Sequence, residues 1–254
     1  MNTLAISAAG TLVTGFLYLY IGNALRKRAV SGQARLANGM FVLWWQALGW
    51  LSLLGAAVTV VYMAGRLEVW VYQSYVLLVL LVLFAALWGL QYYLVFLYTG
   101  SRRSFVSLGV FYAVLFTATV GLVERAGAPT GLSDDGWNIQ PVPKVVYGPA
   151  FNLLFTILII GPAIVAAVAY LRLYWKTDDR TQRYRIAMVT GSVLVWFGTS
   201  LIATGANVSM SVWWQLTSRV ISVLAALTIL AAYKPPQWVR LRYGVRSIRD
   251  EGAA

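Results

Sequence analysis

The chain has 254 residues, of which 60% are hydrophobic and 11% charged, and its formal net charge is +12. Soluble domains carry about 25% charged residues, so this composition indicates an integral membrane protein. The chain contains neither cysteine nor histidine, which excludes disulfides, thiol nucleophiles, thiolate metal sites and histidine-ligated haem.

Apolar stretches along the chain are long enough to cross a bilayer, which takes about 20 mostly apolar residues in a helix. Seven such stretches cover about residues 3–25, 37–64, 70–99, 105–124, 148–175, 186–207 and 211–233. We therefore expect an all-α integral membrane protein with a seven-helix transmembrane bundle over residues 1–236 and a short basic tail over residues 237–254.

Basic residues predict the direction of the chain, because lysine and arginine collect on the cytoplasmic side of membrane proteins. Sixteen of them lie in or beside the connections after the first, third, fifth and seventh spans, whereas Arg66, Arg125 and Lys144 lie on the other side. We expect a multi-pass protein of the plasma membrane, with its N-terminus outside and its C-terminus in the cytoplasm. This topology explains the net charge without a nucleic-acid partner.

The longest connection lies outside the membrane in this topology and covers residues 126–147, "AGAPTGLSDDGWNIQPVPKVVY". Its prolines, its glycines and the pair Asp134 and Asp135 beside Trp137 are typical of turns. Long loops in compact folds are often functional. The segment is therefore either a solvated connector or a lid over an extracellular cavity, and in the second case Asp134, Asp135 and Trp137 are its candidate residues.

One arginine, Arg219, lies about eight residues into the seventh span, which places it about 12 Å from the outer end at 1.5 Å per residue. Burying a guanidinium at such a depth costs at least about 2.5 kcal/mol, so it should face the bundle and find acceptors. The candidate partners at similar depth include Gln73, Tyr75, Thr59 and Tyr62. Arg219 is either part of a structural hydrogen-bond hub or ion pair, or part of a site for an anionic ligand or a lipid headgroup, or it snorkels outward to the membrane surface.

A retinal chromophore would need a lysine inside a span, and the sequence offers none. Lys234 directly precedes Pro235 and Pro236, which end a helix, so it should reach the cytoplasmic headgroups. All eight acidic residues lie at span ends or in connections, whereas proton pumps place acids within the membrane. Catalytic motifs are also missing. We expect no enzyme and no cofactor.

The tail repeats apolar residues at helical spacing: Trp238, Leu241, Val245 and Ile248 would share one face of a helix. The basic residues Arg240, Arg242, Arg246 and Arg249 fall mostly off that face. Such a segment can rest on anionic membrane lipids. A frayed tail and a helix that docks a partner are the alternatives.

The third span ends in "LWGLQYYLVFLYTGSRRSF", from Leu87 to Phe105. This stretch resembles the seven-helix N-terminal sensor region of bacterial and archaeal histidine kinases, whose third helix ends in a motif of the type F-x-x-x-Y-T-G-R. The matching residues here are Phe96, Tyr98, Thr99, Gly100 and Arg102. The resemblance implies signal sensing, although this chain should carry no kinase domain.

Two functions therefore remain open, and a substrate transporter is a third that the lack of acids within the spans disfavours. The first is a receptor-like membrane sensor that passes its signal to a separate membrane or cytoplasmic protein. The second is an accessory or scaffold subunit of a larger membrane complex, which would hold lipid or pigment against its many aromatic side chains. The sequence contains 11 tryptophans and 15 tyrosines, and packing between helices would explain the deep ones equally well.

Overall fold

The computed structural model describes residues 3–26, 34–99, 103–125, 127–142, 164–165, 167–205 and 212–245. Within these ranges, the side chains of residues 34, 97–99, 196–205, 212–216 and 219 are not described.

Long apolar helices dominate the described part of the chain. Four of them are long and apolar enough to cross a membrane: α1 (Thr3–Arg26), α2 (Ala34–Met63), α3 (Val69–Thr99) and α4 (Ser104–Arg125). Their ends lie within three residues of the predicted spans. They confirm a mostly helical membrane protein with several transmembrane helices.

The later helices are α6 (Arg180–Gly205), α7 (Val212–Tyr233) and the short α8 (Gln237–Tyr243). The end of α7 and α8 together are apolar enough for a fifth crossing, but they are bent by 50° at the break between them. Most of the predicted fifth span, residues 148–175, lies outside the described residues, although residues 167–176 are helical. A count of seven crossings therefore stays a prediction.

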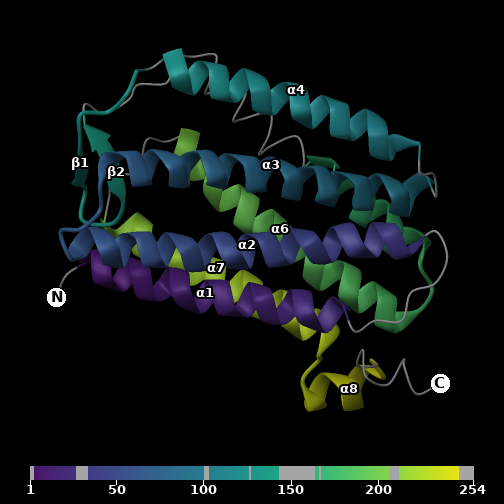
Figure 1. Cartoon of the computed structure of the whole chain (residues 1–254). Coiled ribbons are helices and arrows are strands. Elements are labelled where there is room, and N and C mark those ends of the chain that lie inside the picture. Colours follow the sequence, from purple (N-terminus) through teal and green to yellow (C-terminus); the bar gives the residue numbers. More distant parts are fainter. Residues whose placement is uncertain are drawn as a thin grey trace.

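The first four helices form a row in chain order, with α6 and α7 behind them (Figure 1). Each helix of the row packs against the next, and α7 packs against both α1 and α6. One end of the bundle holds the start of α1, the turn between α2 and α3, and the end of α4. We call it the hairpin end, because the strands β1 and β2 lie there, and we call the opposite end, beside α8, the tail end.

The contact between α1 and α2 depends on small residues. A Cβ atom built at Gly49 would lie 3.0 Å from the carbonyl oxygen of Gly15, and one built at Gly15 would lie 3.1 Å from that of Gly49. The two backbones therefore touch at this point. Without a hydrophobic driving force between helices in lipid, such close approach is a main source of association.

Aromatic side chains fill the centre of the bundle. Trp44 and Trp45 are both 4% exposed, and the rings of Phe41 and Tyr93 stack with their centroids 4.3 Å apart. These residues join α2 to its neighbours, as expected of deep aromatic residues that pack helices.

The connection after α4 contains an antiparallel hairpin of β1 (Gly131–Asp134) and β2 (Ile139–Val142), with Asp134 opposite Ile139. Asp135 shapes the turn, because its Oδ1 accepts hydrogen bonds from the backbone N–H groups of Trp137, at 2.9 Å, and Asn138, at 2.7 Å. Gly136 has φ 85°, which favours glycine. The all-α prediction is wrong for residues 131–142, which form a two-stranded sheet.

The tail does not form the predicted single helical face. Gly244 adopts φ 64° and ends α8, so Val245 lies beyond the helix. Val239 and Val245 are each 4% exposed, whereas Trp238 is 64% and Leu241 is 79% exposed. Val239 and Val245 are therefore buried against the protein, whereas Trp238 and Leu241 face its surroundings. Ile248, Arg246 and Arg249 lie outside the described residues.

Candidate functional site

The hairpin is attached to the ends of two helices by tyrosine hydroxyl groups. Tyr62, at the end of α2, donates a hydrogen bond to Oδ2 of Asp134 at 3.0 Å. Tyr72, at the start of α3, donates to the carbonyl oxygen of Ile139 at 3.1 Å. The turn also lies close to α1, because a Cβ atom at Gly136 would lie 3.1 Å from Oγ1 of Thr3. The hairpin thus spans the ends of three helices.

A cavity of about 340 Å³ lies beside this hairpin, between the hairpin-end parts of α3 and α4. We call it the outer cavity. Its lining residues come from α3, α4, the segment after α4, and β2: Tyr72, Gln73, Val76, Leu77, Val123, Glu124, Gly127, Ala128, Pro129 and Pro141. Ligand pockets commonly enclose about 300–1,000 Å³ and combine apolar walls with a few polar groups. The outer cavity fits this description.

Two lining side chains, Gln73 and Glu124, offer hydrogen-bonding groups to the outer cavity. Among the described residues, the Glu124 carboxylate forms no ion pair and the Gln73 amide forms no hydrogen bond. The hydroxyl of Tyr72 already donates to the hairpin, so its ring is held in place as a wall. The cavity therefore combines a fixed aromatic wall with a carboxylate and an amide that can each meet a ligand.

The residues predicted to surround Arg219 are divided among several environments. Thr59 donates a hydrogen bond to the carbonyl oxygen of Gly55 at 2.8 Å, within α2. The Tyr75 hydroxyl approaches the same glycine, because a Cβ atom built at Gly55 would lie 3.0 Å from the hydroxyl oxygen. By contrast, Gln73 lines the outer cavity and Tyr62 binds the hairpin. The side chain of Arg219 lies outside the described ones, so its role stays a prediction.

The three predicted lid residues lie in the hairpin, but none of them lines the outer cavity, so their role as a lid stays a prediction. Asp134 binds Tyr62, Asp135 shapes the turn, and the side chain of Trp137 is 5% exposed. From the sequence, Glu124 is an acid near the depth of Arg219 but closer to the surface, and its place in a cavity between α3 and α4 could not be predicted. The nearby sequence signal is the Gly-Ala-Pro segment, residues 127–129, whose turn-forming residues line the same cavity as Glu124.

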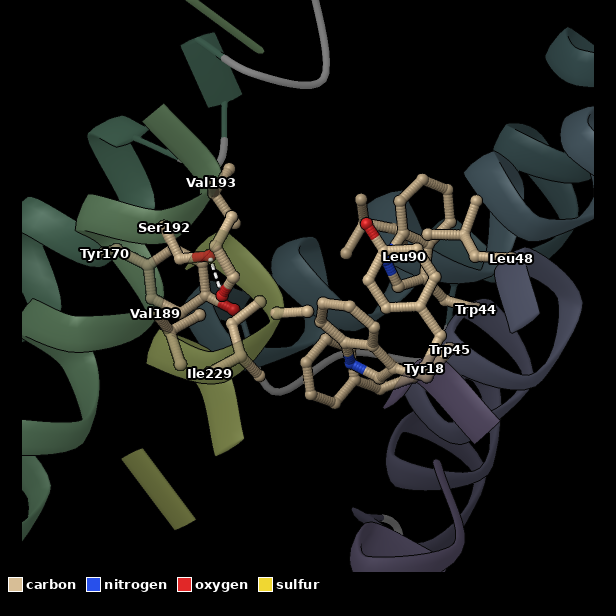
Figure 2. A pocket seen from close by; sticks show the side chains of 13 residues that line it. Tyr18, Trp44, Trp45, Leu48, Leu90, Tyr170, Val189, Ser192, Val193 and Ile229 are labelled. Atoms are coloured by element: carbon tan, nitrogen blue, oxygen red, sulfur yellow. Dashed lines mark hydrogen bonds between the residues drawn. The ribbon is translucent and has the colours of Figure 1, made fainter. Parts of the chain in front are cut away.

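A second cavity, of about 30 Å³, lies in the core and is lined mainly by apolar and aromatic side chains. Figure 2 shows Tyr18, Trp44 and Trp45 on one side of it and Tyr170, Ser192 and Val193 on the other. Ser192 donates a hydrogen bond to the carbonyl oxygen of Ala225 at 2.8 Å. This volume has room for only a few water molecules, since each needs about 10–15 Å³ of such space. It is too small for a pigment.

Basic and aromatic side chains meet at the tail end. Lys234 donates a hydrogen bond to the hydroxyl of Tyr20, and its Nζ lies 4.3 Å from the centre of that ring. Arg185 is 7% exposed and lies over the ring of Tyr233, 6.0 Å from its centre. Arg240 and Arg242 on α8 are exposed. Contacts of this kind hold α1, α6 and α7 together at this end.

Comparisons of the chain with protein-family models, with curated proteins and with solved structures find no match. Over the described residues, no group of three or more acidic side chains is arranged to hold a metal ion.

Removing the hydroxyl groups that hold the hairpin should loosen it without unfolding the bundle. Tyr62→Phe should lower the free energy of opening the hairpin by about 1 kcal/mol, because one net hydrogen bond is lost. Hydrogen exchange of the hairpin amides should then be about fivefold faster. Tyr184→Phe is the control, because its hydroxyl donates to Ala231 at the opposite end of the bundle, at 3.3 Å. Equal exchange rates in both variants would show that Tyr62 does not hold the hairpin.

Proposed function

We propose that the protein is a receptor-like seven-helix membrane sensor that receives a signal at the hairpin end and passes it to a separate cytoplasmic partner. The outer cavity carries this proposal. It lies between two helices and is bordered by a hairpin that is hydrogen-bonded to α2 and α3. A ligand that fits one arrangement of these elements better than another would shift the equilibrium between the arrangements.

The directions of the helices support an odd number of crossings. Lys234, just after α7, contacts Tyr20 near the end of α1, so both helices run towards the tail end. Ser192 of α6 contacts Ala225 of α7, and Tyr184 contacts Ala231, so α6 starts at the tail end and runs antiparallel to α7. α4 ends at the hairpin end and α6 starts at the tail end, so the proposed fifth span over residues 148–175 would connect these two ends.

Charge supports the orientation. Among the described residues, Arg66 and Arg125 are the basic residues at the hairpin end, whereas the tail end carries many more, including Arg26, Lys176, Lys234 and Arg240. The positive-inside rule then places the tail end in the cytoplasm. The resemblance to sensor regions of histidine kinases agrees with this topology and with a signalling partner outside the chain. The exposed Trp238 and Leu241 of α8, with Arg240 and Arg242, suit a place at the cytoplasmic surface of the membrane.

Cysteine labelling tests the orientation directly, because the natural chain has no cysteine. In intact cells, a membrane-impermeant maleimide should label Ser133→Cys on the hairpin. Arg240→Cys on α8 should be labelled only after the membrane is permeabilised. The reverse pattern would contradict the proposed orientation, and labelling of both sites in intact cells would contradict a tail in the cytoplasm.

Native mass spectrometry of protein extracted gently from its own membrane tests the function. We expect a small-molecule adduct and a bound cytoplasmic protein with the natural chain. The adduct should be lost in Ala128→Trp, which places a bulky ring in the outer cavity from an exposed loop. Absence of both the adduct and the partner would contradict a sensor.

An accessory subunit of a larger membrane complex is the second candidate, and α4 favours it. Only Tyr112 and Thr119 of this helix are buried among its described side chains, whereas Val106, Val110, Phe111 and Val114 are more than half exposed. A stable assembly with other membrane proteins, together with no adduct that depends on the outer cavity, would support this function against the sensor.

A further inference from the structure

We infer that the outer cavity binds a small organic cation with an apolar body, such as a quaternary ammonium compound. This inference deepens the proposed function and rests on it for the cavity's place outside the cell. The binding itself can be measured whether or not the protein signals.

The charge of the site favours a cation. Glu124 is the single ionisable residue among the lining residues apart from Tyr72. Arg125 follows it directly, but successive residues on a helix point in different directions, and Arg125 does not line the cavity. A ligand cation would therefore meet the carboxylate without displacing an existing ion pair within the described structure.

The aromatic wall favours the same ligand. The face of a tyrosine ring attracts a cation placed within about 6 Å of its centre, and aromatic walls are a common device for holding quaternary ammonium groups. The hydroxyl of Tyr72 is bonded to Ile139, so the ring does not have to be ordered when the ligand arrives. This preorganisation reduces the entropic cost of binding.

The remaining walls require an apolar body. Val76, Leu77 and Val123 contribute hydrocarbon surface, and Pro129 and Pro141 add rigid apolar surface from the connection. A small hydrated metal ion would leave these walls without contacts. An apolar anion would meet the Glu124 carboxylate, and like charges in a partly enclosed site repel. The Gln73 amide oxygen can accept a hydrogen bond from a ligand that carries an N–H group.

Titration calorimetry with benzyltrimethylammonium tests this inference, using the full chain in nanodiscs of zwitterionic lipid and empty nanodiscs as the blank. We expect saturable binding, and we expect the anion of similar shape, phenylmethanesulfonate, to bind at least tenfold more weakly. Glu124→Gln keeps the size of the side chain and removes its charge, so it should weaken binding of the cation about fivefold.

Two variants provide matched controls. Glu68→Gln removes an exposed acid at the same end of the bundle that does not line the cavity, and it should bind the cation as the natural chain does. Ala128→Leu narrows the cavity without a change of charge and without a new aromatic ring, so it should weaken binding of the cation at least tenfold. Melting temperatures within about 2 °C of the natural chain would show that each variant is folded.

The inference fails if the anion binds as tightly as the cation, or if Glu124→Gln and Glu68→Gln have equal effects. It also fails if Ala128→Leu binds the cation as tightly as the natural chain, because the site then lies elsewhere. Its failure can be separated from that of the proposed function. If the cation binds saturably but the mobility of a spin label at Arg240→Cys is the same with and without it, the cation site is supported and sensing is contradicted. A cavity-dependent native adduct that is anionic contradicts the cation site and supports sensing.

Discussion

Gly49→Ala should lower the melting temperature of the protein by several degrees, although alanine is the better helix former. Its new Cβ atom would lie 2.7 Å from Cγ of Leu19 and 3.0 Å from the carbonyl oxygen of Gly15. Leu19 can change its rotamer, but the Gly15 carbonyl belongs to the backbone of α1, so the two helices have to separate. Overpacking of this kind costs about 1–3 kcal/mol.

Gly39→Ala provides the control in the same helix, because a Cβ atom there would meet no other atom within 4 Å. Alanine in place of an exposed helical glycine stabilises by about 0.5–1 kcal/mol, so this variant should melt at the same or a slightly higher temperature. In the double variant Gly49→Ala/Leu19→Ala, the clash with the leucine side chain is removed but the clash with the Gly15 carbonyl remains. Only the part of the lost stability that comes from the leucine clash should therefore be recovered. Equal melting temperatures for the two glycine variants would contradict a close contact between α1 and α2.

The helices could be predicted from the sequence because bilayer thickness imposes a simple rule on their composition. The first four helices end where charged residues and turn residues interrupt the apolar runs, as at Gly65 between α2 and α3. There the backbone N–H of Arg66 donates to the carbonyl oxygen of Val61, and the backbone N–H of Gly65 donates to the carbonyl oxygen of Tyr62. These two hydrogen bonds close the end of α2. Local chemistry decides such an ending, so a single sequence is enough to find it.

The outer cavity could not be predicted, because it depends on contacts between distant residues. The turn residues around Asp135 predict a bend, but nothing near them in the sequence indicates that Asp134 bonds to Tyr62, 72 positions earlier. The same is true of the group predicted around Arg219. Depth along a span can be counted from the sequence, whereas the direction in which Gln73 or Tyr75 points depends on how α3 is rotated against its neighbours.

In the tail, one residue interrupts a periodic apolar pattern. The spacing of Trp238, Leu241 and Val245 fits a continuous helix, but Gly244 adopts a left-handed conformation that stops α8. Glycine after a short helix is a known stop signal, and here it outweighs the apolar periodicity. Val245 then turns back towards the protein instead of facing the surroundings with Trp238.

Trp88→Ala should destabilise the protein by about 3 kcal/mol or more and should loosen α4 in particular. Trp88 joins α3 to α4 in three ways. Its Nε1 donates a hydrogen bond to the carbonyl oxygen of Phe105 at 3.0 Å, and its ring lies 4.7 Å from the Phe105 ring, centre to centre. It also occupies the space beside Gly109, where a Cβ atom would lie 3.0 Å from its Cζ2.

A melting curve measures the loss of stability in Trp88→Ala, and a spin label at Val110→Cys measures the mobility of α4. Trp50→Ala is the control, since that side chain is 64% exposed and its loss should change the stability by no more than about 0.5 kcal/mol. The stability of Trp88→Phe should lie between those of Trp88→Ala and Trp50→Ala, because phenylalanine keeps an aromatic ring but loses the hydrogen bond to Phe105. If Trp88→Ala leaves the label as immobile as in the natural background, α4 is held by contacts other than Trp88. Because the outer cavity lies between the same two helices, a loosened α4 should also weaken whatever ligand the cavity binds.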